Sequence, residues 1–322
     1  MSNSIPGRLN YSGDLKPVIL RVAEDYKLGK VTQYKPIKVG YEDCNVLIET
    51  DTQRFLAKIF ASSRTPEEVQ RYASIIRTVV DNGVNHPNLK VSSQGDIYRD
   101  ETGLSLVLLD FVEGKTFLEM DRAPVESELE VVVKQAALIN KVDLKLPPLF
   151  DSWSVQNLEG IYEKIRQFLE PSDLKLAEEA KERFLSVPID TLPHAFVHGD
   201  ITKANTILSD KNEIYIIDFA VTNWYPRIQE LAVIAANLLY DQTKPEKPQE
   251  LAPNLVKIYR QYGELTEAEE KHLPNYILGA IAMEFLGGSK VKYLDGHDSE
   301  ETQYWIELGR KNLQKALNYE SS

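Results

Sequence analysis

The feature that most constrains the fold of this chain is a change in its apolar pattern near Glu113. Before this point, short runs of alternating apolar and polar residues are separated by turn-forming residues, a pattern typical of strands joined by tight turns. After it, apolar residues recur at the three- and four-residue spacing of amphipathic helices. We therefore expect an α+β chain with two parts: a strand-rich part over residues 1–112 and a mostly helical part over residues 113–322.

The strand-rich part is predicted to hold a five-stranded antiparallel sheet, with strands at about 31–39, 44–50, 54–60, 96–99 and 104–111. A helix at about 14–28 precedes the sheet. A second helix begins at Thr65, which can cap it, with Pro66 at the first helical position and Glu67 and Glu68 where the helix dipole favours carboxylates. This helix is expected to end near Asn82-Gly83.

The second part is predicted to hold helices at about 124–140, 157–169, 173–186, 227–240, 248–262, 266–286 and 299–318. One β-hairpin, formed by 206–208 and 213–218 with a turn between them, interrupts this helical pattern.

Composition excludes several classes of protein. The 322 residues carry 37 basic and 49 acidic side chains, a net charge of −12, which argues against a general nucleic-acid binder. The best candidate for a membrane span, Ile277–Leu286, is interrupted by Glu284 and is too short to cross a bilayer, and the N-terminus lacks the apolar core of a signal peptide. The single cysteine, Cys44, rules out an internal disulfide framework. We expect a cytoplasmic protein without nucleic-acid or membrane partners.

The stretch from His198 to Phe219 carries the chemistry. Asp200 and Asn205 lie five residues apart in a predicted loop, and the hairpin then returns a second carboxylate, Asp218. A loop carboxylate can accept the proton of an attacking hydroxyl, while an amide oxygen and a second carboxylate can coordinate Mg²⁺. Phosphoryl transfer needs this combination of a positioned nucleophile and metal-bound phosphates. We therefore predict Asp200 as the catalytic base and Asn205 and Asp218 as metal ligands.

A cation for the remaining phosphates is expected in the strand-rich part. Lys58 lies within an apolar strand, where it either faces solvent or points inward. An inward lysine needs a carboxylate to keep its charge. Glu67 and Glu68 both qualify, and both are also ordinary first-turn residues. We favour Glu68 as the partner that fixes Lys58 for the α- and β-phosphates of ATP.

These motifs resemble those of the aminoglycoside phosphotransferase and choline kinase-like family of small-molecule kinases, which share the protein-kinase fold. His198–Asn205 reads as the family's His-Gly-Asp-x4-Asn loop, and Ile217–Phe219 reads as its Ile-Asp-Phe motif. The resemblance covers nearly the whole chain. It implies a bilobal kinase-like fold, ATP as the phosphate donor and Mg²⁺ as the metal.

The resemblance also implies roles for residues outside the catalytic stretch. Lys58 and Glu68 match the strand lysine and helix glutamate of the family. Five further residues are implied in nucleotide binding or in support of the catalytic loop: Gly40 and Asn45 in the nucleotide loop, Asp110 and Val112 in the adenine-binding hinge, and His198, which would orient the loop. The nucleotide loop departs from GxGxxG in having one glycine. Glu230 stands where family members commonly carry aspartate, and we expect it to support the catalytic loop.

The expected acceptor is the hydroxyl of a small molecule such as an amino alcohol, an aminoglycoside or a hydroxy amino acid. Trp224 and Tyr225 follow Asp218 in the sequence. Their rings could form an aromatic wall around an ammonium group of the acceptor. Lys203 either contacts the γ-phosphate or is solvated. The net charge is compatible with a cationic acceptor, and a neutral or zwitterionic one remains open. A nucleotide-binding scaffold without turnover and a protein-directed kinase are the alternative functions.

Overall fold

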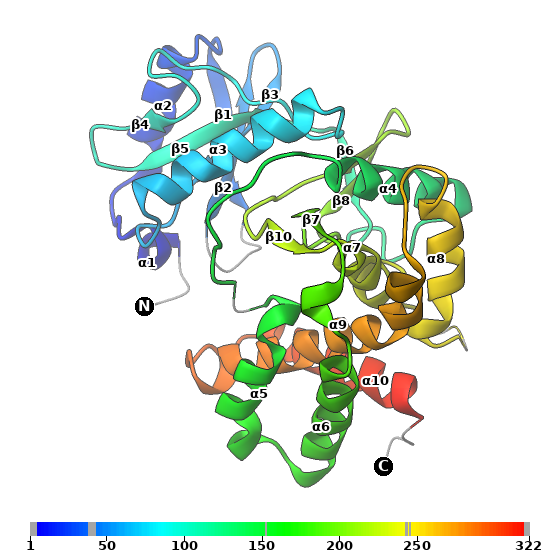
Figure 1. Ribbon diagram of the computed structural model, residues 1–322. Coiled ribbons are helices and arrows are strands. Elements are labelled where there is room, and N and C mark those ends of the chain that lie inside the picture. The colour runs from blue at the N-terminus through cyan, green and yellow to red at the C-terminus, as the bar shows by residue number, and fades with distance from the viewer. Residues whose placement is uncertain (1–4, 38–42, 152, 242–243, 245, 319–322) are drawn as a thin grey trace. The chain divides into compact units, whose positions relative to one another are not determined.

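The computed structural model describes residues 5–37, 43–151, 153–241, 244 and 246–318. The chain forms two compact units, Met1–Glu113 and Gly114–Ser322, and the sequence placed the boundary between residues 112 and 113. Each unit has its own sheet structure and its own helices (Figure 1).

The N-terminal unit contains a five-stranded sheet and three helices. The strands are β1 (Val31–Ile37), β2 (Cys44–Thr50), β3 (Arg54–Ile59), β4 (Tyr98–Arg99) and β5 (Ser105–Asp110). The helices are α1 (Ile5–Leu9), α2 (Leu15–Asp25) and α3 (Pro66–Asp81). The strand order is β1-β2-β3-β5-β4 and each neighbouring pair is antiparallel. The predicted antiparallel five-stranded sheet is thus confirmed.

One face of this sheet packs against α2. Alternate residues of the strands point toward that helix, because successive side chains of a strand lie on opposite faces. The resulting apolar core includes Val18, Ile19 and Val22 of α2 and Val46, Ile48, Ala57 and Ile59 of the strands. Lys58, between Ala57 and Ile59, therefore lies on the other face. Helix α3 reaches the end of β3 through Tyr72, whose ring lies 5.5 Å from that of Phe60.

The C-terminal unit is mostly helical. Its helices are α4 (Glu126–Ile139), α5 (Leu158–Ile165), α6 (Pro171–Leu185), α7 (Ile228–Val233), α8 (Ala252–Tyr259), α9 (Glu267–Tyr293) and α10 (Glu300–Leu317). Its strands are β6 (Gly114–Thr116), β7 (His194–Val197), β8 (Thr206–Ser209), β9 (Ile214–Ile216) and β10 (Asn223–Pro226), arranged as a β6-β8-β9 sheet and a β10-β7 pair. The predicted hairpin is β8–β9, whereas β6, β7 and β10 were not predicted.

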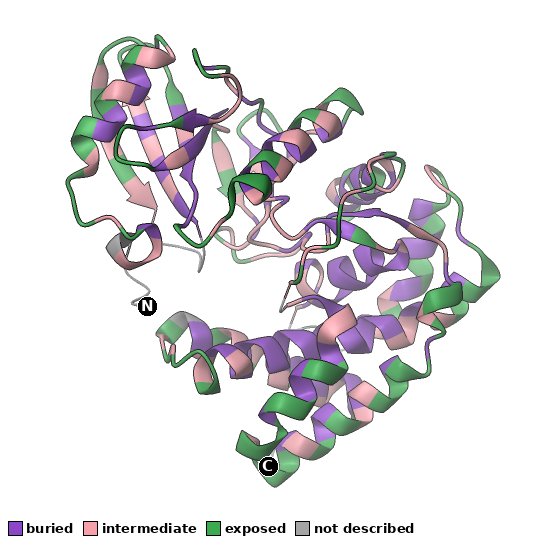
Figure 2. Ribbon diagram, turned by 60° about the vertical axis from the view of Figure 1, so that its left-hand side comes forward, coloured by how far each residue is buried: buried purple, intermediate pink, exposed green. Residues whose placement is uncertain are grey.

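Helix α9 is the central helix of this unit and is buried along most of its length (Figure 2). It continues to Tyr293, beyond the end expected near residue 286. Two glycines that follow Leu286 explain the difference. A side chain on Gly287 would collide with Trp153, and one on Gly288 with Ile306, so these glycines allow close packing rather than ending the helix. In the described part of the chain, no helix combines the length and hydropathy that a bilayer crossing requires.

Candidate active site

The loop between β7 and β8 is held by the ring of His198. Nδ1 accepts a hydrogen bond from the backbone N–H of Asp200 at 3.1 Å, so the proton lies on Nε2, which donates to the carbonyl of Ile217 at 3.1 Å. Burial lowers the pKa of His198 to about 4, and the ring is therefore neutral near pH 7. Gly199 follows in the left-handed region, at φ 83°. The histidine thus orients the loop and ties it to the residue that follows β9.

Glu230 of α7 supports the same loop through hydrogen bonds with its backbone. Its carboxylate is 0 % exposed and accepts hydrogen bonds from the backbone N–H groups of His198 and Gly199, the second at 3.2 Å. Burial raises the pKa of Glu230 to about 7, and the two amide donors oppose that rise. The glutamate therefore makes the kind of contact for which the sequence analysis selected it, despite its longer side chain.

Asp200 and Asn205 are joined directly within the loop. Nδ2 of Asn205 donates to Oδ2 of Asp200 at 2.6 Å and to the Asp200 carbonyl at 3.1 Å. Burial, followed by the negative charge of Asp218, raises the pKa of Asp200 to about 8, while the Asn205 hydrogen bond opposes that rise. The structure thus holds a carboxylate of high proton affinity in a fixed orientation.

The β8–β9 hairpin brings Asp218 next to this pair. Thr206 of β8 pairs with Ile216 of β9, and the N–H of Ile217 donates to the Asn205 carbonyl at 2.9 Å. Asp218 is the next residue and has φ 65°, a left-handed conformation that is uncommon outside glycine and clusters at functional sites. The three residues predicted in the catalytic stretch therefore meet in one place.

The donor atoms of this cluster suit a hard cation. Because Nδ2 of Asn205 bonds Asp200, its Oδ1 is left over, and that oxygen makes no hydrogen bond with the residues that the structure describes. An amide oxygen and the carboxylate of Asp218 are the ligand types that Mg²⁺ takes. Among the described residues, no group of three or more His, Cys, Asp or Glu side chains forms a complete metal cage. The set therefore fits a metal that also binds substrate phosphates.

Lys58 points inward and its carboxylate partner differs from the one predicted. Lys58 is 4 % exposed, and its Nζ lies 3.4 Å from Oδ2 of Asp43 and 5.0 Å from the ring centre of Tyr72. Glu68 instead accepts a hydrogen bond from the N–H of Thr65 at 2.7 Å, completing a capping box at the start of α3. The predicted Lys58–Glu68 pair is wrong because the helix terminus uses that carboxylate.

Asp43 is a functional candidate that the sequence analysis missed. It is 7 % exposed and accepts hydrogen bonds from the N–H of Ala61 at 3.0 Å and from Nε of Arg64 at 3.3 Å. The pairing of Asn45 with Lys58 across β2 and β3 places Asp43, two residues before Asn45, beside the lysine. Only this strand register, which the pattern of single residues does not give, would have indicated the contact.

The other predicted nucleotide-binding residues fall in three settings. Asn45 lies in β2 opposite Lys58. Asp110, at the end of β5, pairs with Nζ of Lys90 at 2.5 Å, and the half-buried Val112 follows it. Gly40 lies outside the described residues.

The predicted acceptor residues lie in the C-terminal unit. Trp224 of β10 pairs with Phe196 of β7, is 37 % exposed, and has Nζ of Lys145 5.2 Å from its ring centre. The hydroxyl of Tyr225 accepts a hydrogen bond from Asn223 at 3.0 Å. Lys203 is not simply solvated, because its Nζ donates to the carbonyl of Tyr240 at 2.9 Å and burial lowers its pKa.

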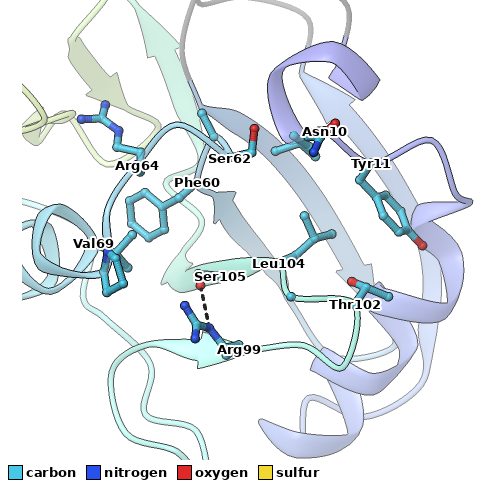
Figure 3. A pocket seen from close by; sticks show the side chains of 14 residues that line it. Asn10, Tyr11, Phe60, Ser62, Arg64, Val69, Arg99, Thr102, Leu104 and Ser105 are labelled. Atoms are coloured by element: carbon cyan, nitrogen blue, oxygen red, sulfur yellow. Dashed lines mark hydrogen bonds between the residues drawn. The ribbon is translucent and has the colours of Figure 1, made fainter.

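A separate cavity of about 290 Å³ lies in the N-terminal unit (Figure 3). Arg64 and Arg99 line it together with the apolar side chains of Phe60 and Leu104, and Nε of Arg99 donates to the hydroxyl of Ser105 at 3.4 Å. Of the residues described by the structure, none that the sequence analysis selected lines this cavity.

Comparison with known proteins identifies the family. The family model described as "Phosphotransferase enzyme family" matches residues 33–267. This chain belongs to the phosphotransferase enzyme family. The assignment confirms the resemblance and the enzyme class predicted from the His-Gly-Asp-x4-Asn and Ile-Asp-Phe motifs.

The relatives and solved structures that resemble this chain include small-molecule kinases. The chain is 23% identical over 289 residues to homoserine kinase of Rhodopseudomonas palustris (strain BisB5), covering 84% of this chain and 82% of that protein. It is 22% identical over 270 residues to homoserine kinase of Zymomonas mobilis, covering 80% of each.

Two solved structures show the same fold. The complex of spectinomycin phosphotransferase with ADP and spectinomycin superposes with a TM-score of 0.69 at 12% identity, covering 94% of this chain and 98% of that one. The microcompartment-associated aminopropanol kinase gives a TM-score of 0.67 at 14% identity, covering 94% and 97%. At these identities the likeness concerns the fold.

Proposed function

We propose that this member of the phosphotransferase family transfers the γ-phosphate of ATP to a hydroxyl of a small molecule, with Mg²⁺ as the metal. The observation that carries the proposal is the cluster of Asp200, Asn205 and Asp218, built from a loop and a hairpin. Phosphoryl transfer needs little more from a protein than a positioned base and oxygen ligands for a metal.

Asp200 is the proposed base. The hydrogen bond from Asn205 fixes Oδ2 of Asp200 and so sets the direction of its carboxylate. As the acceptor oxygen forms its bond to phosphorus and the bond to ADP breaks, the hydroxyl proton passes to Asp200. Asp200 can accept this proton only in its ionised form, which a metal ion bound beside it would favour.

Oδ1 of Asn205 and the carboxylate of Asp218 are the proposed ligands of Mg²⁺. Mg²⁺ commonly takes one or two protein carboxylates and completes its shell with water and substrate phosphates, which matches this small donor set. When bound, the metal supplies positive charge that offsets the developing charge on the phosphate oxygens. Lys58, paired with Asp43, is proposed to hold the α- and β-phosphates, with Gly40, Asn45, Asp110 and Val112 as further nucleotide contacts.

The names of two relatives support one class of acceptor. Homoserine and aminopropanol, named in two of them, each carry a hydroxyl and an amine. We propose an acceptor of the same kind, with Trp224 and Tyr225 as candidate contacts.

The test is an ADP-release assay over amino alcohols, hydroxy amino acids, aminoglycosides and sugars, with ATP and Mg²⁺. Transfer to at least one metabolite, abolished in Asp200→Asn, is the expected result. Binding of Mg·ATP without transfer to any metabolite would identify a nucleotide-binding scaffold instead. Faster transfer to peptides than to metabolites would identify a protein-directed kinase.

A further inference from the structure

The cavity of the N-terminal unit is not used by the proposed mechanism. Three segments of that unit line it: residues 9–11 before α2, residues 60–69 from the end of β3 into α3, and residues 99–105 between β4 and β5. Its volume of about 290 Å³ lies at the lower end of the range of small-molecule pockets, which begins at about 300 Å³. The cavity therefore has room for a small metabolite.

The lining of this cavity combines an apolar interior with a polar edge (Figure 3). Phe60, Val69 and Leu104 are buried and supply the apolar surface. Arg99 and Thr102 are exposed and can be reached from solvent. Pockets for small molecules typically have this composition, in which apolar walls bury the ligand and a few polar groups fix its orientation.

The charge of the lining is opposite to that of the whole chain. The chain carries 49 acidic and 37 basic residues, yet two arginines and, among the described residues, no aspartate or glutamate line the cavity. Nε of Arg64 donates to Asp43 at 3.3 Å, so a carboxylate balances its charge. Asp100 follows Arg99 in the sequence but pairs with Arg21 at 2.7 Å. Arg99 therefore remains as the positive charge that a ligand can use.

The guanidinium of Arg99 also has hydrogen-bond donors to spare. In the described part of the chain it makes no ion pair, and its single hydrogen bond runs from Nε to the hydroxyl of Ser105 at 3.4 Å (Figure 3). The two terminal nitrogens are thus available. A planar guanidinium matches a carboxylate or a phosphate, each of which can accept two parallel hydrogen bonds from it. The chemistry of the cavity is therefore that of a site for an organic anion.

We propose that this cavity binds a small organic anion, a carboxylate or a phosphate monoester, through the guanidinium of Arg99. The apolar part of the ligand lies against Phe60 and Leu104. None of the described lining residues belongs to the cluster of Asp200, Asn205 and Asp218. The ligand is therefore distinct from the acceptor that Asp200 serves, and the inference does not depend on the proposed function.

The experiment is calorimetry on the full chain with glycerol 3-phosphate, L-malate and glycerol. A non-hydrolysable ATP analogue and Mg²⁺ are present at saturating concentration, so that the proposed nucleotide site is filled. We expect at least one of the two anions to bind with a Kd of about 1 mM or below, and glycerol, which lacks the charge, to show no binding. The tighter of the two anions identifies the ligand as a phosphate monoester or a carboxylate.

Two variants test whether binding occurs in this cavity. Arg99→Gln should weaken binding of the anion about tenfold or more, because the hydrogen bonds to the charged guanidinium are lost. Lys30→Gln removes one positive charge from an exposed position of the same unit outside the cavity, and it should leave the Kd unchanged. Thermal unfolding confirms that both variants are folded.

Four results would overturn the inference: no binding of either anion, binding of glycerol as tight as that of glycerol 3-phosphate, an unchanged Kd in Arg99→Gln, or equal weakening in both variants. The titration requires no turnover. Its outcome therefore stands apart from the success or failure of the proposed kinase activity.

Discussion

Nδ2 of Asn205 donates to Oδ2 of Asp200 across 2.6 Å, which gives one amide two tasks. Its nitrogen orients the proposed base, and its remaining oxygen can face a metal. A change at Asn205 would therefore disturb proton transfer and metal binding together, whereas changes at Asp200 and Asp218 should separate them.

Replacing Asp200 by asparagine should lower kcat about a thousandfold, because the hydroxyl loses its proton acceptor and the transition state loses several kcal/mol of stabilisation. The affinity for ATP should change little. Steady-state kinetics and nucleotide-binding calorimetry measure the two effects. Full activity in Asp200→Asn would exclude it as the base.

Replacing Asp218 by asparagine should instead raise the Mg²⁺ concentration needed for half-maximal rate, since an amide is a weaker ligand for Mg²⁺ than a carboxylate. We expect a rise of about tenfold or more, together with a lower kcat. Asp210→Asn, in the exposed turn of the same hairpin, is the matched control. An unchanged Mg²⁺ requirement in Asp218→Asn would remove this residue from the metal site.

Replacing Asp43 should disturb Lys58, and with it the KM for ATP, more than replacing Glu68. Asp43→Asn leaves Lys58 without the carboxylate at 3.4 Å, and loss of one partner of a buried ion pair costs about 3 kcal/mol of unfolding free energy. Denaturant unfolding measures this cost, and the KM for ATP should rise as well. Glu68→Gln should leave that KM unchanged, because Glu68 caps α3. An equal rise in both variants would restore Glu68 as the partner of Lys58.

Replacing Trp224 by alanine should raise the KM for the acceptor several-fold if its ring contacts that molecule, while the KM for ATP stays unchanged. Steady-state kinetics with each substrate varied in turn gives both values. Equal losses on both substrates would place Trp224 outside the acceptor site.

The ion pair of Arg21 and Asp100 should contribute to the loss of stability of the N-terminal unit in acid. Two hydrogen bonds from Arg21, at 2.7 and 2.8 Å, lower the pKa of Asp100 from 3.8 to about 2. A lowered folded-state pKa stabilises the fold above pH 4, and this contribution is lost as the pH falls through about 2. With solvent screening of the partly exposed Arg21, we expect roughly 1 kcal/mol. Urea unfolding between pH 5 and pH 2 should show a smaller loss in Asp100→Asn than in the wild type.

Much of the fold was readable from local pattern. The strands of the N-terminal sheet, the capping box at Thr65 and the β8–β9 hairpin all depend on residues close in sequence. The cluster of Asp200, Asn205 and Asp218 was predictable for the same reason, because a single loop and hairpin build it. The short strands β6, β7 and β10 were missed because each pairs with a distant segment, or is too brief to show alternation.

The sequence by itself determined the α+β class, the family and the catalytic loop, since these follow from short-range periodicity and from one contiguous motif. Only the tertiary structure decided which carboxylate pairs with Lys58. The strand register places Asp43 beside Lys58, whereas Glu68 accepts a hydrogen bond at the start of α3. It also decided that Glu284 is buried within α9 together with the apolar residues around it. Burial and partner choice depend on packing between residues far apart in the chain, which no local pattern encodes.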